Sequence, residues 1–161
     1  MRYTVDDVMK WRPCYKRAKV KGLFDRRRSV TLIDILCAEE LSDEDAIWCA
    51  CRVMGWRQCR LFGADCAESV VSPDDDPILA SCIEVVRLYA DGRATDADLR
   101  RVTDATFGLR GATAHAAYDA AYSAYGAVVH SARAAGDGAR AAEHEAQRHA
   151  LLTMALAGEI Q

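Results

Sequence analysis

The stretch ATAHAAYDAAYSAYGAVVHSARAA, residues 112–135, decides the fold. It belongs to a longer tract in which nineteen of residues 105–157 are alanine, and no proline occurs from Asp96 to the end of the sequence. Alanine has the highest intrinsic helix propensity, and proline is the strongest helix breaker. The tract therefore predicts long helices.

Glycines set the expected bounds of these helices. The tract predicts one helix over 96–135 and another over 139–157. A turn between them and a kink within the first are expected at two glycine-containing segments, 136–138 and 108–111.

Capping and breaking signals predict further helices upstream. Helix starts are marked by a Ser or Thr three residues before an aspartate, as at Thr4, Ser42 and Thr95, and by Asp76 before a proline in the first helical position. With an apolar stripe at helical spacing, these signals predict helices 4–11, 42–54, 56–72 and 77–91. We also choose a helix for the apolar run 30–37, although its period is ambiguous. The basic stretch 16–28 is expected to be a connector that is anchored by Val20, Leu23 and Phe24.

These elements predict an all-α protein. Short N-terminal helices and a helical hairpin, formed by 42–54 and 56–72, are expected to pack on the long alanine-rich helices. The length of 161 residues is typical of one domain. That domain would comprise a basic segment, a helical core and an alanine-rich part, 1–28, 29–92 and 95–161.

The composition is that of a soluble globular chain. Apolar residues make up 51% of the sequence and charged residues 28%, and no run approaches the roughly 18 apolar residues that a membrane-spanning helix requires. The N-terminus, with Asp6 and Asp7, does not fit a secretory signal. We therefore expect a cytoplasmic protein without a membrane partner.

The net charge of −3 conceals an asymmetry between a basic N-terminal segment and an acidic remainder. An acidic patch can steer a basic protein partner, and the acidic candidates for partner binding are Glu39, Glu40, Asp43, Glu44, Asp74, Asp75 and Asp76. A basic segment attracts phosphates or an acidic partner, and Trp11 and Tyr15 could stack on bases. The alternative basic face consists of Arg12, Lys16, Arg17, Lys19, Lys21, Arg26, Arg27 and Arg28.

Motifs for catalysis and metal binding fail on their spacing. The seven cysteines form an odd set without a disulfide framework, so we expect reduced thiols in the core. On a helix, Cys49 and Cys51 would point about 200° apart. His144 and His149 are five residues apart, whereas a zinc-protease helix needs four. No nucleophile elbow or phosphate-binding glycine loop occurs. We therefore expect no enzyme activity, no metal and no cofactor.

Two further groups are interpreted first as structural. Asp65 or Glu68 is expected to pair with an arginine such as Arg52 or Arg57. A seam along the alanine-rich tract is expected to pack in the core, and its members are Phe107, Tyr118, Tyr122, Tyr125 and Val129. The alternative is a ligand pocket lined by the three tyrosines.

Several segments, taken together, resemble a known family. They are Tyr3–Val5, Trp11–Tyr15, Thr31–Leu36, Asp45–Trp48, Leu61–Glu68 and the terminal alanine tract. The chain resembles a phage-encoded immunity protein family, related to the immunity proteins of bacterial polymorphic toxin systems. The resemblance spans most of the chain and is sharpest at Leu61–Glu68. It implies a helical protein of the bacterial cytoplasm that neutralises an effector by binding it.

The main hypothesis is therefore a non-enzymatic inhibitor of a partner protein, either a toxin or a host-defence effector in the manner of an anti-CRISPR. One alternative is a nucleic-acid-associated module that uses residues 10–28. The other is a small-ligand binding protein, for example for a nucleotide. Alanine-rich helix faces could also pair two copies as a homodimer.

Overall fold

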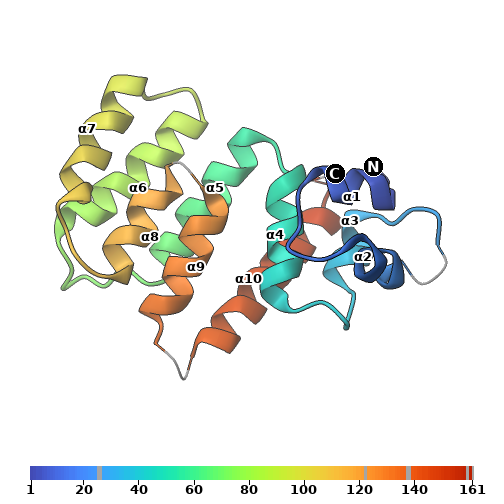
Figure 1. Ribbon diagram of the computed structural model, residues 1–161. Coiled ribbons are helices and arrows are strands. Elements are labelled where there is room, and N and C mark those ends of the chain that lie inside the picture. Colours follow the sequence, from blue (N-terminus) through green and yellow to red (C-terminus); the bar gives the residue numbers. More distant parts are fainter. Residues whose placement is uncertain (25–26, 122, 137–138, 159, 161) are drawn as a thin grey trace. The chain divides into compact units, whose positions relative to one another are not determined.

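The computed structural model describes residues 1–24, 27–121, 123–136, 139–158 and 160, without the side chains of 124 and 125. Over these ranges the chain forms ten helices and no strand, which confirms the all-α class (Figure 1). The helices are α1 (Val5–Lys10), α2 (Arg17–Leu23), α3 (Leu32–Leu36), α4 (Asp43–Val53), α5 (Trp56–Glu68), α6 (Pro77–Ala90), α7 (Asp96–Phe107), α8 (Ala112–Ala120), α9 (Ala124–Ala134) and α10 (Arg140–Leu156). None of the helices in these ranges is long and apolar enough to cross a membrane.

The chain divides into two compact units. The first unit consists of Met1–Val53 and Arg148–Gln161, and the second consists of Met54–Gln147. The helix α10 therefore begins in the second unit and ends in the first. The single domain expected from the length stays a prediction.

In the first unit, α1 packs against α2 and α3 packs against α4. An isolated antiparallel bridge joins Tyr3, just before α1, to Val30, just before α3. Their backbone N–H groups donate to each other's carbonyl oxygens at 2.7 and 2.9 Å. Ile47 of α4 and Leu151 of α10 are fully buried in this unit. The C-terminal segment therefore contributes to the same core as the N-terminal helices.

In the second unit, α5 packs against α6, α8 and α9, and α7 packs against α6 and α8 (Figure 1). Small side chains allow this close packing, because Ala116, Ala117 and Ala120 of α8 are buried. Between α8 and α9, a Cβ atom added to Gly126 would lie 2.5 Å from a carboxylate oxygen of Asp119. Glycine is therefore required for this approach unless Asp119 moves.

The predicted helix 96–135 is wrong in its length, because the segment forms the three helices α7, α8 and α9. The first break lies where the kink was expected: Gly108 ends α7, and Gly111 precedes α8 with a φ of +111°. The second break was not predicted. There the Ser123 hydroxyl accepts a hydrogen bond from the N–H of Gly126 and caps α9. Helix propensity is a weak preference, and the packing of shorter helices on α5 and α6 outweighs it.

The structure also tests the predicted helix 139–157 and the predicted connector 16–28. The predicted helix 139–157 corresponds to α10, and residues 137 and 138 of the predicted turn lie outside the described ranges. The predicted connector 16–28 is wrong over its first half, which forms α2. Val20 and Phe24 are buried as the expected anchors, and Leu23 is half-buried.

The expected hairpin of 42–54 with 56–72 links helices that belong to different units. Each of the two helices packs within its own unit: α4 lies against α3, and α5 lies against α6, α8 and α9. Sequence adjacency and a single intervening glycine are common to hairpins and to unit boundaries. The local pattern therefore could not distinguish the two.

Three threonines form complete capping boxes at helix starts. The boxes of Thr4 and Thr95 were predicted, whereas the box of Thr31 was missed. In each box the carboxylate of the aspartate three residues later accepts hydrogen bonds from the threonine N–H and hydroxyl. The Thr31 box confirms the choice of a helix for the ambiguous run 30–37.

These boxes predict acid sensitivity. Hydrogen bonds from the backbone and hydroxyl of Thr31 lower the pKa of Asp34, and the equivalent bonds lower the pKa of Asp98. A carboxyl group whose pKa is lower in the folded state stabilises the fold above its unfolded pKa, and this stabilisation is lost as the pH falls through the folded value. The free energy of unfolding should therefore fall as the pH drops below about 5.

Urea unfolding at several pH values, with carbon-13 NMR titration of the carboxyl groups, measures this effect. The Asp34→Asn variant is the matched control and should show a shallower pH dependence. An Asp34 carboxyl that titrates at the ordinary value of 3.8 would contradict the prediction.

Candidate functional site

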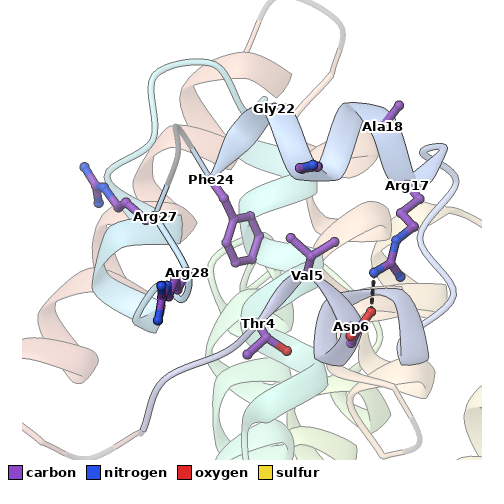
Figure 2. Close-up of a pocket in the computed structure, with 10 residues that line it drawn as sticks. Thr4, Val5, Asp6, Arg17, Ala18, Gly22, Phe24, Arg27 and Arg28 are labelled. Atoms are coloured by element: carbon purple, nitrogen blue, oxygen red, sulfur yellow. Dashed lines mark ion pairs between the residues drawn. The ribbon is translucent and has the colours of Figure 1, made fainter.

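An open hollow of about 740 Å³ lies in the first unit, between α1, α2 and the segment that leads to α3. Its lining residues are Thr4, Val5, Asp6, Arg17, Ala18, Lys21, Gly22, Phe24, Arg27 and Arg28. Figure 2 shows Phe24 and Val5 near the centre, the Arg17–Asp6 ion pair on one side, and Arg27 and Arg28 on the other. Four of the eight residues proposed for the basic face thus line a single cavity.

The amphipathic pattern of α2 creates one wall of the hollow. Val20 and Phe24 are four residues apart, lie on one side of the helix and are buried. Arg17 and Lys21 share the same spacing, are exposed, and line the hollow together with the small residues of α2. Because Ala18 and Gly22 carry little or no side chain, the space between the cations and α1 stays open.

The opposite wall is held by hydrogen bonds. The Tyr3–Val30 bridge fixes the end of the segment that carries Arg27 and Arg28. The guanidinium group of Arg2 also donates to the hydroxyl and the carbonyl oxygen of Ser29, at 2.9 and 2.8 Å. These contacts order the basic wall before any ligand binds.

The cations of the hollow differ in their partners. Arg17 pairs with Asp6, and Arg27 pairs with Asp34 at 3.0 Å. Lys21 and Arg28 form no ion pair with any residue that the structure describes. The unpaired positive charge of the hollow is therefore concentrated at Lys21 and Arg28.

The remaining members of the basic face lie elsewhere. Arg12 and Lys16 are exposed and do not line the hollow. The Lys19 ammonium lies 3.6 Å from the centre of the Tyr15 ring, in a cation–π contact. Arg26 lies outside the described residues.

The acidic candidates are divided between the units. Glu39, Glu40, Asp43 and Glu44 belong to the first unit, and Asp74–Asp76 belong to the second. Two of these carboxylates accept hydrogen bonds from the backbone. Asp75 accepts from the N–H of Ser72, and Asp76 caps α6 by accepting from the N–H of Ile78. The acidic binding surface stays a prediction.

Arg148 was not singled out from the sequence, yet its guanidinium group makes four polar contacts in the first unit. Its guanidinium group donates to the carbonyl oxygens of Leu36, Ala38 and Leu41 at 2.7, 2.8 and 3.2 Å. It also pairs with Asp43 at 2.7 Å, and its side chain is only 16% exposed. A lone arginine in a polar stretch of helix carries no sequence signal for a contact more than a hundred residues away.

The expected pairing of the α5 carboxylates was wrong in its partner. Asp65 and Glu68 pair with Arg87 of α6, at 2.6 and 2.7 Å, rather than with Arg52 or Arg57. Arg57 pairs with Asp91, and Arg52 packs over the Trp48 ring. The pairing of α5 with α6 in space decides which arginine is within reach.

The aromatic side chains considered for base stacking contact other residues of the chain, and one member of the predicted seam is exposed. Trp11 packs edge-on against Tyr3, with ring centres 5.3 Å apart, and the Tyr15 hydroxyl donates to Asp45. Phe107 is 75% exposed, so its assignment to the core was wrong, and it contacts Tyr118. Tyr122 and the side chain of Tyr125 lie outside the described residues, so the tyrosine pocket stays a prediction.

The seven cysteines are free thiols. Cys49, Cys66 and Cys82 are buried as expected, whereas Cys14 and Cys37 are exposed and do not fit the core interpretation. Burial raises the pKa of Cys49 to about 12 and that of Cys82 to about 11. A nucleophilic cysteine needs the opposite shift, toward the thiolate.

The histidines and acids of the described residues form no group of three or more that could hold a metal ion. In the second unit, His130 Nδ1 lies 2.9 Å from the Asp119 carboxylate, and its ring contacts that of His115. This arrangement links α8 to α9.

Comparison with known proteins adds no relative. No protein-family model, curated protein or solved structure matches the chain.

Proposed function

We propose that this protein is a non-enzymatic inhibitor of the immunity type, which neutralises a partner protein by binding it. The observation that carries the proposal is the hollow of the first unit, where four basic side chains surround an apolar centre and the Tyr3–Val30 bridge holds one wall. Exposed charge around an apolar patch is the usual composition of a protein-binding surface.

The chemistry of the other reactive groups also supports binding over catalysis. Burial holds the thiols of Cys49 and Cys82 in the protonated form, because it raises the pKa of each. Asp7, Asp34 and Asp98 are occupied as helix caps. The resemblance to phage-encoded immunity proteins points to the same class of function and to a bacterial cytoplasm as the place of action.

Stoichiometry tests the proposal. The full-length tagged chain is used to capture partners from bacterial lysate, and a captured protein is purified and assayed for its own activity or toxicity. An inhibitor should remove that activity in proportion to the amount added, with an end point near one copy per partner. Full inhibition by a small fraction of an equivalent, together with covalent change of the partner, would overturn the proposal in favour of an enzyme.

A further inference from the structure

We propose that the hollow between α1 and α2 binds an extended acidic segment of the partner protein, with an apolar side chain of that segment seated over Val5 and Phe24. This inference rests on the proposed function and names the chemistry that the site recognises.

The charge of the hollow favours carboxylates. Its lining contains four cations, and the only acidic residue among them, Asp6, already neutralises Arg17. Unpaired positive charge therefore remains at Lys21 and Arg28, whereas Arg27 pairs with Asp34. Arginine can bind carboxylates through paired N–H donors, and Arg27 already donates one hydrogen bond to the Asp34 carboxylate.

The centre of the hollow favours a peptide over a phosphate chain. Figure 2 shows Val5 and Phe24 between the two charged sides. Gly22 lines the same space, and a Cβ atom added there would meet no atom within 4 Å. An acidic peptide can place an apolar side chain in this space between its carboxylates, whereas a phosphate backbone has no such group.

The aromatic rings of the region are not free to stack on bases. The Trp11 ring packs on Tyr3, and the Tyr15 ring is covered by Lys19. Binding of single-stranded nucleic acid without sequence preference usually depends on exposed aromatic rings. The site therefore matches an acidic peptide better than a nucleic acid.

Fluorescence anisotropy with three labelled probes tests this inference. The first is a peptide of about twelve residues in which pairs of glutamates alternate with single leucines. In the second, glycines replace the leucines, and the third is a thymidine oligonucleotide of the same length. We expect the first peptide to bind most tightly at equal salt, and the glycine peptide to bind about fivefold more weakly, because one buried leucine is worth at least this factor.

Charge variants locate the binding site. The double variant Lys21→Glu/Arg28→Glu should weaken binding of the leucine peptide at least about tenfold, through two lost ion pairs and new repulsion. The matched control Arg12→Glu/Lys16→Glu makes the same change in net charge outside the hollow and should change binding by less than about threefold. Asp6→Asn frees Arg17 and should strengthen binding, an effect that a loss of folding cannot produce.

Circular dichroism of each variant confirms that the helices are retained. Equal loss of binding in the two double variants would overturn the inference, because it would indicate a general charge effect. If the oligonucleotide binds more tightly than the peptide, and Lys21→Glu/Arg28→Glu loses this binding, the ligand of the hollow is a nucleic acid and not an acidic peptide. If the Lys21→Glu/Arg28→Glu variant still inhibits a captured partner, the protein is an inhibitor but the hollow is not its binding site.

Discussion

Replacing Arg148 with alanine is expected to lower the free energy of unfolding of the first unit by about 3 kcal/mol. The change removes a guanidinium group that donates to three backbone carbonyl oxygens and pairs with Asp43. The Leu36 carbonyl lies at the end of α3, and the carbonyls of Ala38 and Leu41 lie between α3 and α4. Without Arg148 the carbonyls of Leu36 and Leu41 lose this donor, whereas the Ala38 carbonyl keeps its hydrogen bond from the Leu41 N–H at 3.2 Å. Burying a polar group without a partner is costly.

Urea unfolding measures the total loss, and hydrogen exchange measures where it occurs. Amide protons of α3 and α4 should exchange faster in Arg148→Ala. The amide protons of α6, in the second unit, are the internal control. The Arg148→Lys variant keeps the charge but cannot reach four acceptors, so it should recover only a minor part of the stability. Arg28→Ala removes an exposed arginine of the same unit and should cost less than about 0.5 kcal/mol. An Arg148→Ala protein as stable as Arg28→Ala would contradict the role given to this side chain.

The second large effect is expected at Ile47, whose side chain is fully buried in α4. Ile47→Ala removes three buried carbon atoms and leaves a cavity, which should cost about 3 kcal/mol of unfolding free energy. Ile47→Val removes one methylene group and should cost about 1 kcal/mol.

Thermal and urea unfolding of the Ile47 variants, with Ile33→Ala as the control, test this prediction. Ile33 lies in the neighbouring helix α3 but is 36% exposed, so its truncation should cost less than that of Ile47. The expected loss of unfolding free energy is largest for Ile47→Ala and smaller for Ile47→Val and Ile33→Ala, and this order follows from burial alone. Equal losses for Ile47→Ala and Ile33→Ala would show that the α4 site can collapse around the missing atoms.

The candidate site was only partly accessible to sequence reasoning. The excess of Lys and Arg before residue 29 identified the basic face, and the spacing of Val20 and Phe24 identified its anchors. The helix α2 was missed because a short basic stretch with one glycine has a weak helix signal. Without that helix, Arg17 and Lys21 could not be placed on one wall, opposite Arg27 and Arg28.

The amino-acid sequence by itself determined the helical class, the caps at Thr4 and Thr95, and the positions of most helix starts. These features depend on neighbours three or four residues apart, so their physical causes lie within a short window of sequence. Only the tertiary structure decided the partners of Asp65, Glu68 and Arg148. It also decided the division of 96–135 into three helices and the hollow beside α2. Those features depend on groups that are distant in sequence, and their energies arise only when packing brings the groups together.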